Sequence, residues 1–115
     1  MRLVPEYIEQ FFVKACEFLG LALERRRDGR LRLASVPAWL RQRSTEFTNR
    51  YGEVQASYRD FTFYKEEARR SGAELVAPGH PLLEAVIEEV VAKGEEALRQ
   101  GATFIDPSGE LSGVV

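Results

Sequence analysis

Five arginines lie close together in the sequence and are its best candidates for a binding site. They surround the pair Asp28-Gly29, which is typical of the turn of a β-hairpin. A guanidinium group is planar and permanently charged, so a hairpin tip of this kind is able to bind the phosphates of DNA or RNA. The alternative is a solvated strand edge whose charges keep other strands from pairing with it. The candidate nucleic-acid-binding residues are Arg25, Arg26, Arg27, Arg30 and Arg32.

No set of residues has the spacing expected of a catalytic or metal site. The only histidine, His80, precedes a proline at the start of a predicted helix, where a capping or surface role is expected. The only cysteine, Cys16, lies beside an apolar stripe and is expected to be a small buried hydrophobe. One histidine and one distant cysteine do not supply the three or four ligands of a zinc site, and no phosphate-binding Gly-x-x-x-x-Gly-Lys-Ser/Thr loop occurs. We therefore expect no catalytic residue, metal or cofactor in this domain.

Composition and charge indicate one soluble domain. The chain has 115 residues, 44% of them hydrophobic and 30% charged. It contains no apolar run of the roughly 20 residues that a membrane-spanning helix needs, and a single cysteine fits a reducing cytoplasm. Residues 1–50 carry ten Lys and Arg against six Asp and Glu, a net charge of +4. Residues 51–115 carry six against twelve, a net charge of −6. This asymmetry suggests a face with a preferred partner.

Two helices are predicted from apolar periodicity. The longer one begins at Pro81 and ends before Gly101, with Ile87 at the centre of a broad apolar stripe that we expect to pack on a sheet. Its Gly94 is expected to mark a close contact or a slight bend. The other helix is expected over residues 4–20. Its predicted stripe consists of Ile8, Phe11, Phe12, Ala15 and Leu19.

Residues 21–34 are predicted to form a hairpin with the three-residue loop Arg27-Asp28-Gly29 and Gly29 in the left-handed region. This loop pairs Leu23 with Leu33 and gathers the leucines on one face, whereas a two-residue turn would divide them between both faces. Arg26 and Arg30 then share the outer face, where a polyanion would meet both. The other pairs expected in this register are Glu24 with Arg32 and Arg25 with Leu31.

The remaining segments complete an α+β domain, a mostly antiparallel sheet covered by the two main helices. Further strands are expected at residues 61–64, 75–77 and 102–105, while residues 65–70 either extend a strand or form one helical turn. A short helix is expected to turn Trp39 and Leu40 toward the core. Tyr51 and Tyr58 are interpreted as core aromatics, with base stacking as the alternative.

The order of several short motifs resembles a known family. Residues 61–68 (FTFYKEEA) precede residues 74–82 (ELVAPGHPL) and a long helix. This order resembles the region that follows the motor lobes in bacterial Swi/Snf-type helicase-like ATPases, such as the RNA-polymerase-associated ATPase and phage-defence helicases. Residues 36–41 (VPAWLR) resemble the segment that precedes this region in that family. Within the motif at residues 61–68, the family usually has an acidic residue where this chain has Tyr64.

The resemblance implies that residues 1–115 are one accessory domain, a fragment of a longer nucleic-acid-dependent ATPase that lacks the motor. Two hypotheses follow. In the first, the arginine hairpin contacts DNA or RNA. In the second, the domain is a structural and protein-contact module that braces the rest of the parent ATPase or docks a partner such as RNA polymerase.

Overall fold

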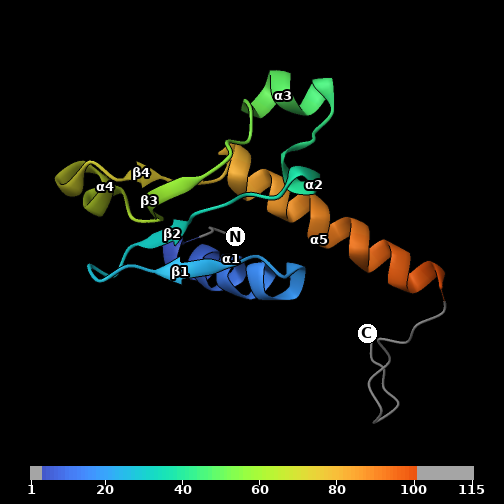
Figure 1. Ribbon diagram of the computed structural model, residues 1–115, viewed down its shortest axis with the longest axis horizontal. Helices are drawn as coiled ribbons and strands as arrows, with labels where there is room; N and C mark the ends of the chain where they lie inside the picture. Colours follow the sequence, from blue (N-terminus) through green and yellow to red (C-terminus); the bar gives the residue numbers. More distant parts are fainter. Residues whose placement is uncertain (1–3, 101–115) are drawn as a thin grey trace, which may run out of the picture.

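The computed structural model describes residues 4–100 (Figure 1). Its helices are α1 (Pro5–Leu19), α2 (Ala38–Arg41), α3 (Thr45–Tyr51), α4 (Lys65–Ser71) and α5 (Pro81–Arg99). Its strands are β1 (Leu23–Arg25), β2 (Leu31–Leu33), β3 (Tyr58–Thr62) and β4 (Glu74–Leu75). The predicted α+β class is confirmed. Within residues 4–100, no helix is both long enough and apolar enough to cross a membrane.

The four strands form one mixed sheet in the order β1-β2-β3-β4. Its first three strands are antiparallel and β4 pairs parallel to β3, so the sheet is mostly antiparallel as predicted. Parallel neighbours need a crossover connection, and α4 provides it between β3 and β4. Of the two alternatives for residues 65–70, the helical one is therefore correct. The strand predicted at residues 61–64 begins earlier, at Tyr58, and the strand predicted at residues 75–77 is limited to Glu74–Leu75. Residues 102–105 lie outside the described residues.

The hairpin has the predicted register and loop. Gly29 has φ of 90°, in the left-handed region that favours glycine. The loop closes through the Arg26 amide, which donates to the Arg30 carbonyl oxygen at 2.7 Å. Leu31 and Leu33 are buried, because this register turns them toward the core. The strand pairs are Leu23 with Leu33, Glu24 with Arg32 and Arg25 with Leu31.

An aromatic cluster joins α1 to the sheet. Phe12 of α1 and Phe61 of β3 are fully buried, and their rings meet edge to face with centroids 5.8 Å apart. The ring of Phe63 packs against both, with its centroid 5.3 Å from that of Phe12 and 6.1 Å from that of Phe61. Each such pair contributes about 0.5–1.5 kcal/mol beyond the burial of its area. The helices α1 and α5 also pack against each other and share this core.

The apolar stripe of α5 is buried over only half of its length, which differs from the prediction. In Figure 1 the C-terminal half of α5 extends past the sheet and past α1. A Cβ at Gly94, in this half, would meet no heavy atom within 4 Å, so the predicted close contact there is absent. Along the stripe Leu82, Leu83 and Val86 are buried, Ile87 and Val90 are partly buried, and Val91 and Leu98 are exposed.

The predicted stripe of α1 is wrong at Phe11, whose side chain is exposed. Successive residues of a helix point about 100° apart, and the buried direction is centred on Phe12, so Phe11 lies at the edge of the core. Tyr7 and Phe18 lie on the same side of α1 as Phe11 and are more exposed still.

Arg43 fastens α2 and α3 to α5, a link that the sequence analysis did not identify. Its side chain is 7% exposed and donates to Glu88 at 2.9 Å and to Glu89 at 2.6 Å. It also donates to the carbonyl oxygen of Trp39 at 2.9 Å. Trp39 itself is exposed and not in the core as predicted, because α2 is a single turn whose inward position is taken by Leu40.

The core interpretation is confirmed for Tyr58, which is buried and whose hydroxyl accepts a hydrogen bond from the Gln55 amide at 2.8 Å. Tyr51 is partly buried, with its ring centroid 4.9 Å from that of Phe47. Both rings therefore pack within the domain.

We predict that Leu82→Ala lowers the free energy of unfolding by about 2–5 kcal/mol, because Leu82 is fully buried. Ile87→Ala is expected to cost about 1–2 kcal/mol, since that side chain is only partly buried. Urea unfolding measures both values. An Ile87→Ala cost equal to that of Leu82→Ala would contradict the exposure found for α5.

Candidate functional site

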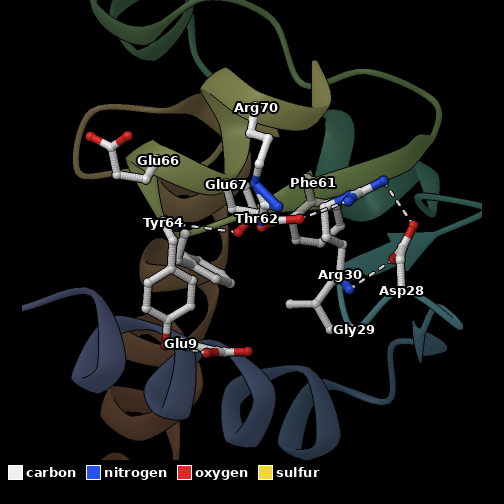
Figure 2. A pocket seen from close by; sticks show the side chains of 12 residues that line it. Glu9, Asp28, Gly29, Arg30, Phe61, Thr62, Tyr64, Glu66, Glu67 and Arg70 are labelled. Atoms are coloured by element: carbon white, nitrogen blue, oxygen red, sulfur yellow. Dashed lines mark hydrogen bonds and ion pairs between the residues drawn. The ribbon is translucent and has the colours of Figure 1, made fainter.

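The arginine hairpin is held against the domain by the chain's own carboxylates (Figure 2). Arg30 binds Asp60 of β3 with two hydrogen bonds, 2.6 Å from Nε to Oδ1 and 3.0 Å from Nη2 to Oδ2. Its Nη1 lies 2.7 Å from Glu67 of α4, and Nη2 lies 2.7 Å from Asp28. The hydrogen bonds to Asp60 raise the pKa of Arg30 above its ordinary value. Arg30 thus joins the hairpin tip to β3 and α4, whereas the sequence analysis placed it on a free outer face.

Arg26 belongs to the same network. It donates to Asp28 at 3.0 Å, to the Arg59 carbonyl oxygen at 3.0 Å, and lies 3.5 Å from Asp60. The hydrogen bonds from Arg26 hold the pKa of Asp28 below its usual range. Asp28 also accepts from the amide of Arg30 at 3.0 Å, so one carboxylate fixes the turn and neutralises the arginines.

The other three arginines differ in their surroundings. Arg25 is 3.2 Å from Glu9 of α1, and Arg32 is 3.6 Å from its cross-strand neighbour Glu24. Arg27 is exposed and makes no ion pair within residues 4–100. The structure therefore brings four of the five candidate arginines onto carboxylates of the same chain.

A cavity of about 400 Å³, lined by both charged and apolar side chains, lies between the hairpin, α1 and α4. Tyr64 and Glu9 both line this cavity. The Tyr64 hydroxyl donates to Glu9 at 2.7 Å, and this hydrogen bond raises the pKa of Tyr64 to about 12. Glu67, which also lines the cavity, pairs with both Arg30 and Arg70. Each of these charged or hydroxyl groups already has a partner in the domain, so the cavity presents no unpaired group that marks it as a ligand site.

The carboxylates of this network were not identified from the sequence. Asp60 and Glu67 follow Arg30 by 30 and 37 residues, and Glu9 precedes Arg25 by 16. The pairing of β2 with β3, which sets Leu31 opposite Phe61, brings Asp60 to Arg30, and α4 brings Glu67 there. The only available signal was the excess of acidic residues in the second half of the chain.

His80 has the capping role expected of it. Its Nδ1 accepts a hydrogen bond from the Leu82 amide at 3.0 Å at the start of α5. The proton is therefore on Nε2, which lies 2.6 Å from Glu74. Both ring nitrogens are used within the fold. This arrangement fixes the beginning of α5 and leaves no nitrogen available to act as a base.

Cys16 is buried in the core, as expected, and burial raises the pKa of its thiol to about 12. A pKa this high disfavours the thiolate, which is the nucleophilic form of cysteine. Within residues 4–100 no group of three or more His, Cys, Asp or Glu side chains is placed to hold a metal ion.

Asp28 predicts a pH dependence of stability. Because folding lowers its pKa, its contribution is complete above the unfolded value of about 3.9 and is lost as the pH falls through the folded value. The difference in melting temperature between wild type and Asp28→Asn should be largest near neutral pH and should shrink below about pH 4. Glu53→Gln, which removes one exposed charge outside the network, is the matched control. A constant difference across the pH range would contradict the role of Asp28.

The network also predicts unequal effects of two arginine substitutions. Arg30→Ala should lower the melting temperature, because it leaves Asp60 and Glu67 close together without the cation between them. Arg27→Ala should leave it nearly unchanged, because Arg27 is exposed. Equal melting temperatures for the two variants would show that the ion pairs of Arg30 contribute nothing to the fold.

Comparison with known proteins adds no relative: no family model matches the chain, and no curated protein or solved structure is detectably similar to it. The resemblance to Swi/Snf-type helicase-like ATPases therefore stays a prediction from short sequence motifs.

Proposed function

We propose that this chain is a non-catalytic accessory domain that binds another polypeptide through the surface formed by α1 and α5. One observation carries the proposal: large apolar side chains are gathered, exposed, on these two helices. They are Tyr7, Phe11 and Phe18 on α1 and Val91 and Leu98 on α5. Scattered exposed apolar residues are normal, but residues that follow one side of a helix are typical of an interaction surface.

The arrangement of charges favours a polypeptide over nucleic acid. Phosphates would have to displace Asp28, Asp60 and Glu67 from Arg26 and Arg30, and these carboxylates also repel a polyanion. Each phosphate contact adds about 0.9 to the slope of log K against log salt for duplex DNA. A single available arginine therefore supports only weak binding of that kind.

Nucleic-acid contact through the hairpin is the second candidate, and the exposure of Arg27 is the observation that favours it. The sequence resemblance bears on the partner in either case. It would make the bound polypeptide part of a parent ATPase, or a protein such as RNA polymerase that the ATPase engages.

Site-specific photo-crosslinking in cells tests the proposal. A photoreactive phenylalanine analogue replaces Tyr7 on α1, Arg27 on the hairpin or, as the control, Arg69 on the exposed side of α4. All three positions are exposed, so the fold should tolerate the analogue. The Tyr7 position should give protease-sensitive adducts well above those of the control, because it lies on the proposed surface.

The Arg27 position separates the two candidates. We expect polypeptide adducts at Tyr7 and, at Arg27, only background crosslinking that nuclease treatment does not change. Nuclease-sensitive adducts at Arg27 with no adduct at Tyr7 would overturn the proposal in favour of nucleic-acid binding.

A further inference from the structure

A groove runs between α1 and the N-terminal half of α5. It has a volume of about 440 Å³, within the range of about 300–1,000 Å³ common for binding pockets. Pro78 closes one end, and the groove is otherwise lined by Tyr7, Ile8, Phe11, Leu83, Glu84 and Ile87. Its walls are almost entirely apolar, and no lysine or arginine lines it.

The apolar surface continues from this groove along α5. A second hollow on the helix begins at Ile87, which belongs to both, includes Val91, and is also lined by Arg43. Leu83, Ile87 and Val91 are spaced four residues apart and so form one ridge of the helix. Glu84 and Glu88 border this ridge on one side, one position after Leu83 and Ile87, and Glu95 follows Val91 by four residues and ends the apolar part of the ridge. The apolar ridge is therefore bounded by carboxylates.

The charge of α5 as a whole agrees with this border. The helix carries five glutamates against Lys93 and Arg99, a net charge of −3. Arg43 neutralises part of this charge, since it pairs with Glu88 and Glu89. Glu95 lies further along and makes no ion pair within residues 4–100.

From this geometry we infer that the occupant of the groove is an amphipathic α-helix of another protein, with an apolar face and flanking lysines or arginines. The inference rests on the proposed function and names its partner by chemistry. Apolar anchors at i, i+3/i+4 and i+7 would enter the groove between Phe11 and Ile87. The basic flanks would meet the carboxylates beside the α5 ridge, which sets orientation and speeds association.

A helix suits the groove better than an extended strand. Strand addition depends on hydrogen bonds to the free edge of a sheet, and here the walls are side chains of two helices and the loop before α5. An extended chain would leave its backbone groups unpaired against apolar walls, at a cost that a helix avoids because it satisfies them internally.

Charge also argues against occupants from this same sequence. Residues 101–115 contain Asp106 and Glu110 and no lysine or arginine, so they are mismatched to an acidic border. A second copy bound through the same surface would be isologous and would bring two copies of the acidic border into one interface. A basic partner has neither penalty.

A designed peptide tests the inference with the full chain. The probe is a fluorescein-labelled, 18-residue helical peptide with leucines at i, i+3, i+4 and i+7 and lysines on both flanks. Its matched control has glutamate in place of every lysine. Fluorescence anisotropy should show the lysine peptide bound at least about fivefold more tightly at low salt, and the difference should shrink as salt is raised.

Variants of the domain locate the binding site. Tyr7→Ala and Phe11→Ala should each weaken binding of the lysine peptide by about tenfold, because they remove walls of the groove. Trp39→Ala, an exposed aromatic outside the groove, should change it by less than about twofold. Glu84→Gln keeps the acceptor for the Gly79 amide but removes the charge, so it should reduce the preference for lysine over glutamate. Circular dichroism shows that each variant remains folded.

Three results would overturn the inference: no binding of either peptide, equal binding of the two, or equal losses for Phe11→Ala and Trp39→Ala. Any of these, together with polypeptide crosslinks from Tyr7, would leave the proposed function standing with a different kind of partner. Nuclease-sensitive crosslinks from Arg27 without crosslinks from Tyr7 would instead remove the proposed function itself.

Discussion

The burial of Phe12 against Phe61 and Phe63 sets the position of α1, and much of the structure depends on it. With Phe12 turned into the sheet, helical geometry turns Phe11 and Tyr7 outward, toward α5. The same contact holds α1 beside β1, where Glu9 forms an ion pair with Arg25. The aromatic core and the open groove are thus two consequences of one packing arrangement.

The ion pairs of the hairpin act on a different part of the fold. Arg30 lies between Asp28, Asp60 and Glu67 and links the loop to β3 and α4. Such pairs stabilise a surface only modestly when they are isolated, but a network with bidentate geometry fixes the orientation of its members. The arginines therefore position the hairpin on the sheet, and most of their charge is already used inside the domain.

The helices α1 and α5, which contribute to the core, also expose large apolar side chains on their outer sides. Their inner sides share the buried cluster, while their outer sides form an apolar groove bordered by glutamates. This arrangement is the basis of the proposed binding of a basic amphipathic helix. Arg30 and Arg43, from the positive half of the chain, pair with carboxylates of the negative half. The net charge of each half therefore does not indicate which face of the domain would meet a partner.

Local features of the sequence determined the elements. The start of α5 is set by Pro81 and its His80 cap, and the end of α1 by Gly20 with its left-handed backbone. The register of the hairpin is set by the Asp28-Gly29 turn. Each of these signals extends over only a few residues, so it can be read from the sequence. The tertiary structure decided what each side chain contacts. The exposure of Phe11 depends on where α5 lies, which the periodicity of α1 alone does not encode.

The partners of Arg30 show the same division. Asp60 and Glu67 reach it only because β3 pairs with β2 and α4 follows β3, which brings together residues 30 and 37 positions apart. A run of arginines in sequence has the same appearance whether or not such carboxylates lie opposite it. The sequence by itself therefore predicted a charged hairpin, and only the fold decided that its charges are mostly paired and that the free surface lies on α1 and α5.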